Sequence, residues 1–125
     1  MRTDGRVRDR DPGDRLGAAE LGAELGERAT LVQFSTAFCQ PCRATRRILA
    51  DVSAMVPGVA HVEIDAESRL DLVRRLDVMR TPTVFVLDAR GAIVRKAAGQ
   101  PRKADVLAAL GGAVSHDSSH KPDDM

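Results

Sequence analysis

The chain has 125 residues, 43% of them hydrophobic, and its formal net charge is +1. This length is typical of one domain whose core is large enough to fold without the help of a disulfide. The near-neutral charge and the low aromatic content, three Phe without Trp or Tyr, argue against nucleic acid as the partner.

The two ends of the chain differ in composition from its middle. Residues 1–15 mix Arg and Asp with Gly and Pro, a composition typical of a flexible, solvated arm that holds at most a short strand around Val7. Residues 115–125 are polar and are predicted to form a disordered tail. The folded domain is therefore expected over residues 16–114.

Helix and strand patterns alternate between these ends. Leu16, Leu21 and Leu25 predict an amphipathic helix that ends near Arg28. The strands that we expect further along the chain are 31–34, 59–64, 83–87 and 92–98, and the helices are a segment that opens at the cysteines and stops before 57, another around 70–76 and a last one over 102–113.

This order of elements predicts an α/β fold. A β-α-β unit with a right-handed crossover is followed by a helix, a hairpin with its turn at 88–91 and a terminal helix, which gives a mixed sheet of four or five strands sandwiched by helices. In such sheets functional groups gather beyond the carboxyl ends of the strands. The helix that carries Cys42 is predicted to begin there.

The only two cysteines of the chain, Cys39 and Cys42, follow the apolar run 29–34. Two thiols separated by two residues can close a small disulfide, and the N–H groups at a helix N-terminus favour a thiolate on the first of them. A thiolate attacks a partner's disulfide, and a nearby second thiol resolves the mixed disulfide that forms. Cys39 is therefore the candidate nucleophile and Cys42 the candidate resolving thiol, while Pro41 suits the first helical turn.

Two other uses of the cysteines stay open at this point. Zinc usually needs four ligands, and the remaining candidates are His61, His116 and His120, two of them in the polar tail. We therefore expect no metal. A purely structural disulfide would close a loop of only two residues, which removes little entropy from the unfolded chain.

The segment from 29 to 113 resembles a thioredoxin-family domain. The resemblance rests on the joint occurrence of Cys-Gln-Pro-Cys with Thr81-Pro82-Thr83, and on Asp65, Gly91 and Gly99 at the ends of strands and in the hairpin. It implies a thioredoxin-like fold and a thiol–disulfide oxidoreductase that acts on protein disulfides. It implies no cofactor beyond the redox-active pair of cysteines.

The same resemblance implies a substrate groove beside the disulfide. A trans proline at the start of a strand is ordinary, whereas the resemblance implies a cis Thr81-Pro82 bond, with the Thr81 backbone placed to pair with an extended substrate strand. Phe38 stands where the family commonly has Trp and would keep an apolar lid beside the thiols. The groove residues that we expect are Phe38, Gln40, Pro41, Arg80, Thr81 and Pro82.

Basic residues flank both motifs. Arg43, Arg46 and Arg47 begin the helix after the cysteines, and their ordinary role is a solvated basic face. The resemblance places Arg80 on the rim of the groove, where a guanidinium would stabilise the thiolate and prefer acidic partners.

Gln33 stands where thioredoxins commonly bury an Asp beneath the second cysteine, and an amide cannot titrate. His61 and Glu63 lie on one face of the following strand by the period-two rule. One hypothesis is that His61, or Glu63 through a water, relays protons for Cys42. The other is that Gln33 and His61 hydrogen-bond each other as satisfied interior polar groups, which is the commoner outcome.

The sequence thus predicts a monomeric, thioredoxin-like protein-disulfide reductase that receives electrons from an upstream reductase or dithiol protein. No apolar stretch approaches the length of a membrane span, and the N-terminus lacks the apolar segment of a signal peptide, so we expect a soluble, cytoplasmic chain without a membrane partner. Two alternatives stay open: a non-catalytic thioredoxin-fold binding module, and the soluble domain of a membrane-tethered thiol exchanger whose anchor precedes Met1.

Overall fold

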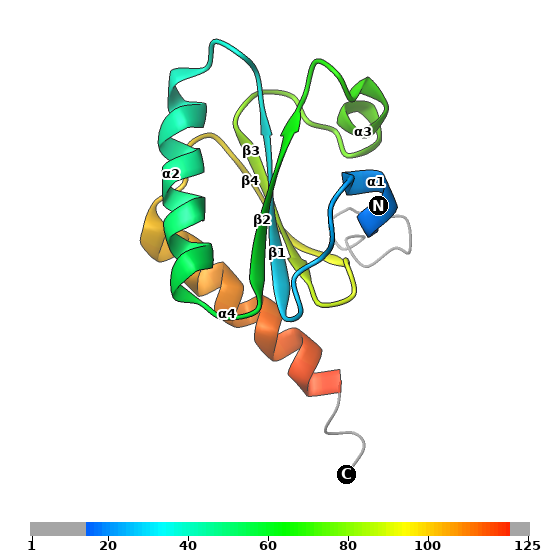
Figure 1. Ribbon diagram of the computed structural model, residues 1–125, viewed down its shortest axis with the longest axis vertical. Coiled ribbons are helices and arrows are strands. Elements are labelled where there is room, and N and C mark those ends of the chain that lie inside the picture. The colour runs from blue at the N-terminus through cyan, green and yellow to red at the C-terminus, as the bar shows by residue number, and fades with distance from the viewer. Residues whose placement is uncertain (1–14, 121–125) are drawn as a thin grey trace, which may run out of the picture.

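The structure is a computed structural model, and it describes residues 15–120. Four strands and four helices follow one another in the described part of the chain (Figure 1). They are α1 (Ala18–Leu21), β1 (Ala29–Ser35), α2 (Gln40–Met55), β2 (Val59–Asp65), α3 (Leu70–Arg75), β3 (Thr83–Asp88), β4 (Ile93–Ala98) and α4 (Lys103–His120).

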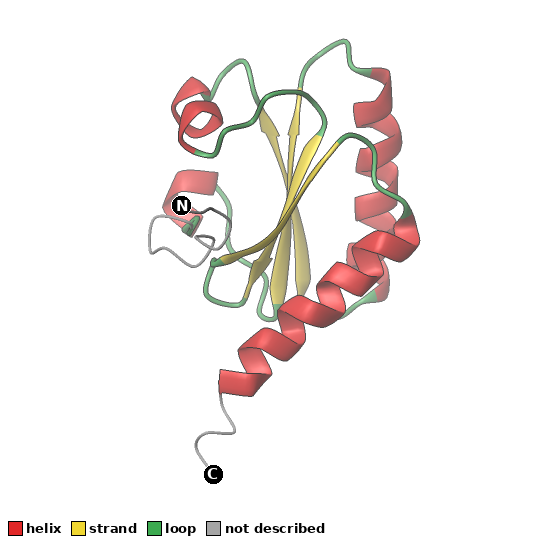
Figure 2. Ribbon diagram, turned by 180° about the vertical axis from the view of Figure 1, so that it is seen from behind, coloured by secondary structure: helices red, strands yellow, loops and turns green. Residues whose placement is uncertain are grey.

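The strands form one mixed sheet in the order β2-β1-β3-β4. β1 pairs with β2 in parallel and with β3 antiparallel, and β3 pairs with β4 as an antiparallel hairpin. The helices α2 and α4 cover one face of the sheet and α1 and α3 lie on the other (Figures 1 and 2). The predicted α/β fold with a mixed sheet between helices is therefore confirmed, with four strands.

β1 is one of the two inner strands of the sheet, and all seven of its residues are buried. Its side chains alternate between two apolar clusters, so both faces of the strand lie in the core. Phe34 belongs to the cluster under α1 and α3, where its ring packs edge-on against the Phe85 ring, with the two ring centroids 5.7 Å apart. Leu31 belongs to the cluster under α2 and α4. The rigidity of β1 fixes the place of the loop that carries the cysteines.

α2 confirms the helix predicted after the cysteines. Cys39 is its N-cap residue and Pro41 lies in the first turn, where the lack of an N–H has no cost. Thr45 Oγ1 donates to the Pro41 carbonyl at 2.8 Å, which satisfies one carbonyl inside the helix. The helix ends at Met55, just before Pro57 and Gly58.

The predicted first helix is wrong in length, because α1 has four residues instead of extending to Arg28. Gly22 takes a left-handed conformation, with φ of 72°, and closes the helix through its N–H to the Ala18 carbonyl at 2.9 Å. Leu16 and Leu25 still pack against the core, but from outside the helix. The spacing of these leucines therefore indicates that the residues are buried, and does not indicate that they lie in one helix.

The last helix is longer than predicted, since α4 continues to His120 instead of ending at 113. It reaches into the segment 115–125, which the composition predicted as a disordered tail. Residues 114–120 include neither Gly nor Pro, and Pro122 is the first position after 113 that is incompatible with a helix interior. The strand expected around Val7 and residues 121–125 lie outside the described residues, and the domain limits at 16 and 114 stay a prediction.

Candidate active site

The two cysteines lie at the carboxyl end of β1, where the chain turns into α2. Their sulfurs are joined in a disulfide, with the two Cα atoms 5.1 Å apart. Cys42 is buried, with 1% of its surface exposed, whereas Cys39 is only half-buried. A partner disulfide arriving from solvent can therefore reach the sulfur of Cys39 more readily than that of Cys42.

The backbone at the start of α2 is arranged around the Cys39 sulfur. The N–H of Cys42 lies 3.2 Å from Cys39 Sγ and also donates to the Cys39 carbonyl at 3.1 Å. This N–H belongs to the first turn of the helix, whose donors have no carbonyl partner four residues earlier in the helix and together carry a partial positive charge. Donors in this position favour a thiolate over a neutral thiol when the disulfide is reduced.

The loop before β3, which carries Thr81 and Pro82, contacts the loop that leads to the cysteines. The Thr81-Pro82 bond is cis, as the resemblance implies. Thr81 Oγ1 lies 3.3 Å from Thr36 Oγ1, so this loop and the loop leading to Cys39 are in contact. The Gly99 N–H donates to the Pro82 carbonyl at 2.8 Å, which ties the end of β4 to the same loop. Residues from three distant parts of the sequence thus meet beside the disulfide.

The rim of this site is exposed and partly apolar. Phe38 is 99% exposed, so its ring contacts solvent on nearly all sides, and its role as an apolar lid beside the thiols stays a prediction. Gln40 and Pro41 are exposed on the first turn of α2, and Arg80 is exposed across the site. Met79, which is 81% exposed, was not among the residues predicted for the site. An apolar residue between a helix and the Thr-Pro motif is the signal that could have indicated it.

Gln33 lies directly under the second cysteine and is fully buried. Its Nε2 donates to the Cys42 carbonyl and to Ser35 Oγ, both at 2.9 Å. Its Oε1 lies 3.3 Å from His61 Nε2, so the hydrogen bond expected between Gln33 and His61 is present. Because both Gln33 donors are used on other acceptors, Oε1 accepts from His61, which places a hydrogen on His61 Nε2.

Glu63 is held by α2 rather than by the cysteines. Arg46 donates to both of its carboxylate oxygens, at 2.6 and 2.7 Å. These hydrogen bonds hold the pKa of Glu63 below its ordinary value and raise the pKa of Arg46. The pKa of His61 is lowered by burial, an effect that the Glu63 carboxylate opposes without cancelling it. In the described part of the chain neither His61 nor Glu63 hydrogen-bonds to Cys42.

Replacing Arg46 by Gln is expected to lower the free energy of unfolding at pH 7 by about 0.5 kcal/mol, because the Arg46 and Glu63 side chains are 48% and 28% exposed and the pair is screened by solvent. The folded-state pKa of Glu63 is depressed, so the pair stabilises above the unfolded pKa of roughly 4.3 and its contribution is lost as the pH falls through the lower folded value. Urea unfolding should thus distinguish the variant from the parent at pH 7 but not near pH 2. Arg47→Gln, one residue along and without an ion pair in the described structure, is the matched control, and an equal loss there would contradict the assignment.

The chain matches the family model described as Thioredoxin over residues 18–111. It belongs to the thioredoxin family. Among curated relatives, Thioredoxin H5 of Oryza sativa subsp. japonica is 34% identical over 65 residues, which are 52% of this chain and 47% of that protein. Thioredoxin H-type of Picea mariana is 28% identical over 100 residues, 77% of this chain and 78% of that protein. The chain spans about half or less of the first relatives it matches.

Solved structures of thioredoxins share the fold. Oxidised mitochondrial thioredoxin 3 from Saccharomyces cerevisiae has a TM-score of 0.60 and 19% identity, and the match covers 69% of this chain and 79% of that one. The long form of thioredoxin F from spinach chloroplast has a TM-score of 0.62 and 20% identity, with 70% and 72% covered. At these identities the likeness shows the fold alone.

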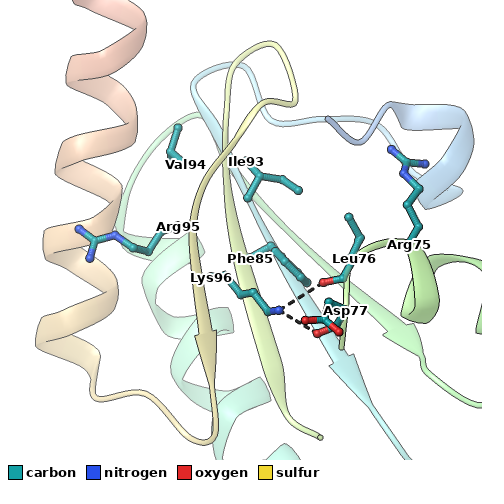
Figure 3. Close-up of a pocket in the computed structure, with 8 residues that line it drawn as sticks. All are labelled: Arg75, Leu76, Asp77, Phe85, Ile93, Val94, Arg95 and Lys96. Atoms are coloured by element: carbon teal, nitrogen blue, oxygen red, sulfur yellow. Dashed lines mark hydrogen bonds between the residues drawn. The ribbon is translucent and has the colours of Figure 1, made fainter. Parts of the chain in front are cut away.

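Away from the cysteines, this thioredoxin-family chain has a pocket of about 400 Å³ between α3 and the edge strand β4 (Figure 3). Lys96 extends across it and donates from Nζ to the Leu76 and Asp77 carbonyls at 3.3 and 2.8 Å. These bonds satisfy carbonyls at the end of α3, so the lysine serves the fold. None of the residues predicted for the site lines this pocket.

In residues 15–114, no group of three or more His, Cys, Asp or Glu side chains is placed to hold a metal ion. Within the described residues, no helix combines the length and the apolar character needed to cross a membrane. The cofactor-free site stays a prediction.

Proposed function

We propose that this chain is a protein-disulfide reductase in which Cys39 attacks and Cys42 resolves. The observation that carries the proposal is the unequal setting of the two sulfurs. Cys39 is the more accessible of the two and receives an N–H at the start of α2, while Cys42 is buried behind it. Accessibility and a stabilised thiolate are the two properties that an attacking thiol needs.

The reaction begins with the reduced dithiol. The Cys39 thiolate attacks one sulfur of a partner disulfide, so that the partner's S–S bond breaks, a bond from Cys39 to the partner forms, and the other partner sulfur leaves as a thiolate that takes up a proton. Cys42 then loses its proton and attacks Cys39 Sγ. The mixed disulfide breaks, the disulfide between the two cysteines forms, and the second partner sulfur leaves and is protonated. Two electrons and two protons pass to the partner.

The groove beside the disulfide would hold the partner chain during this exchange. The contact between Thr36 and Thr81 keeps the loop before β3 against the cysteine loop. The backbone N–H and carbonyl of Thr81 are the groups that we propose for pairing with an extended partner segment. Phe38, Gln40, Pro41 and Pro82 would contact its side chains.

Gln33 would hold the start of α2 in place and would not transfer a proton. Its amide is satisfied on both sides, and it carries no proton that can be lost at neutral pH. We propose that it fixes the start of α2 through the Cys42 carbonyl. A relay through His61 or Glu63 stays a hypothesis, and the Cys42 proton would leave through water.

Electrons for the next cycle would come from an upstream reductase or a dithiol protein, since the chain has no nucleotide-binding or flavin-binding motif. The two thiols carry the chemistry, so the reaction needs no further cofactor. A monomer that acts as a reductant in the cytoplasm is the setting that we propose.

The experiment that tests the proposal is titration of the dithiol against a buffer of reduced and oxidised glutathione, read by the mass added on alkylation of free thiols. We expect one reversible two-electron transition between roughly −300 and −100 mV, the range spanned by exchange-active dithiols. A non-catalytic binding module would show no reversible couple in this range. That result would contradict the proposed function.

A further inference from the structure

Three arginines near the two motifs of the candidate active site have no acidic partner among the described residues. Arg43 and Arg47 lie one turn apart on α2, and Arg80 precedes Thr81 and Pro82 across the disulfide. All three are exposed, and none of them forms an ion pair within the described residues. Arg46, between the first two, is different because Glu63 neutralises it.

Acidic residues do occur nearby, but they leave these arginines free in the described structure. Asp51 follows Arg47 by one helical turn without a bridge to it, and Asp77 precedes the loop that carries Arg80. These three arginines therefore carry positive charges that no carboxylate of the described residues pairs with, although the whole chain is nearly neutral, with a net charge of +1.

The Arg80 side chain lies against Gly99. Its guanidinium occupies the space that a side chain at position 99 would fill: a Cβ built on Gly99 would lie 2.9 Å from Arg80 Nη2. Gly99 also has a φ of 90°, which disfavours any residue with a side chain. Because the Gly99 N–H donates to the Pro82 carbonyl, the guanidinium lies next to the residue that holds the Thr81-Pro82 loop.

The backbone supports this placement while the guanidinium donors remain open. The Arg80 carbonyl accepts from Thr83 Oγ1 at 2.6 Å, which fixes the loop at the start of β3. In the described part of the chain, no acceptor hydrogen-bonds to the guanidinium. A planar group with five N–H donors matches a carboxylate in a bidentate geometry.

Two exposed apolar side chains adjoin the same motifs. Phe38 and Met79 are 99% and 81% exposed, and they directly precede Cys39 and Arg80 in the sequence. Exposed apolar side chains next to unpaired arginines suit a partner segment that carries acidic residues, because complementary charge speeds encounter and disfavours wrong partners.

We propose that Arg80, with Arg43 and Arg47 on the α2 side, selects protein disulfides whose cysteine is flanked by Asp or Glu. This inference rests on the proposed function, since it names the class of partner that the exchange reaction takes. Arg80 binds a carboxylate close to the reacting cysteine, and the two α2 arginines add long-range attraction to the same acidic segment.

The test uses three synthetic peptide disulfides that differ only beside the cysteines, with Asp, Asn or Lys at the flanking positions. Each carries a fluorophore and a quencher, so the signal comes from the peptide alone; the chain itself has no Trp or Tyr. The second-order rate constant of the reduced protein is measured for each at low salt and at about 0.5 M salt, a concentration at which exposed charges are strongly screened.

For the parent protein we expect the Asp peptide to react about tenfold faster than the Lys peptide at low salt, and this ratio to shrink at high salt. Arg80→Gln should lower the ratio several-fold, Arg80→Glu should reverse the preference, and the double variant Arg43→Gln/Arg47→Gln should lower it independently. Arg90→Gln removes the same charge at the β3–β4 turn, which lies at the other end of the sheet, and should leave all three rates unchanged (Figure 1).

Equal rates for the Asp, Asn and Lys peptides would overturn the inference and leave the proposed function standing, because the Asn peptide would still be reduced. A change in Arg90→Gln as large as in Arg80→Gln would overturn it as well, since the effect would then come from net charge alone. If none of the three peptides is reduced, the proposed function fails and the inference falls with it. Thermal unfolding of each variant verifies that the fold is intact.

Discussion

Replacing Cys39 by Ser is expected to reduce insulin-disulfide turnover to the rate of the buffer blank. The hydroxyl has no thiolate to offer at neutral pH, and the buried Cys42 is poorly placed to substitute for it. Replacing Cys42 by Ser is also expected to abolish repeated turnover, but for another reason. Cys39 still attacks, and the mixed disulfide persists because no second thiol resolves it.

Both variants are expected to fold, since the disulfide closes a short loop and contributes little to the stability of the domain. Far-ultraviolet circular dichroism and urea unfolding of the two proteins provide the control. Turnover by Cys39→Ser near the parent rate, in protein that is fully folded, would mean that Cys42 or another group is the nucleophile.

Replacing Gln33 by Asp is expected to raise the rate of insulin reduction at neutral pH by several-fold, less than the roughly 10²–10⁴-fold that an optimally positioned general base supplies. The amide lies under Cys42 and donates to its carbonyl at 2.9 Å, so a carboxylate in its place would lie on the Cys42 side of β1, where it can take the Cys42 proton directly or through a water. Gln33→Asn is the control because it has the same length as Asp and does not titrate. An Asp variant no faster than the Asn variant would show that proton transfer does not limit resolution.

The same substitution should change how stability depends on pH. Burying a carboxylate at a fully buried position costs free energy unless it is paired, and His61 is the partner within reach. Burial now lowers the pKa of His61, whereas an ion pair with the introduced carboxylate would raise it. The pair would then stabilise fully below the unfolded His pKa of roughly 6.5, and its contribution would be lost as the pH rises through the higher folded value.

Those elements that bury a regular apolar pattern were predicted well from the sequence. β1, α2, β2 and the hairpin of β3 and β4 follow the expected ranges closely, because β1 and β3 are short, largely apolar runs and α2 carries its apolar residues along one helical face. α1 fails because Leu16 and Leu25 are buried by tertiary packing while Gly22 ends the helix between them. Burial alone cannot distinguish a short helix with packed flanks from a long one.

The parts of the site that depend on residues close in the sequence were predicted, and the parts that depend on contacts between distant segments were missed. The spacing of the two cysteines sufficed to propose their roles, and the hydrogen bond from His61 to Gln33 follows from neighbouring strands in parallel register. The position of the Arg80 side chain against Gly99 could not be predicted from the residues, because it depends on how the end of β4 meets the loop before β3. Met79 was missed although it is an apolar residue between a helix and the Thr-Pro motif, a position that could have indicated it.

The most direct test of the proposed exchange is the adduct that Cys42→Ser forms with a partner disulfide. The variant is mixed with a peptide disulfide, quenched with an alkylating reagent, digested and analysed by mass spectrometry. We expect one peptide thiol per chain, attached through a disulfide to Cys39, in a bond that dithiothreitol reverses. Cys39→Ser under the same conditions should form at most a trace of adduct on Cys42. Equal adduct formation by the two variants, or none on Cys39, would contradict the assignment of Cys39 as the attacking thiol.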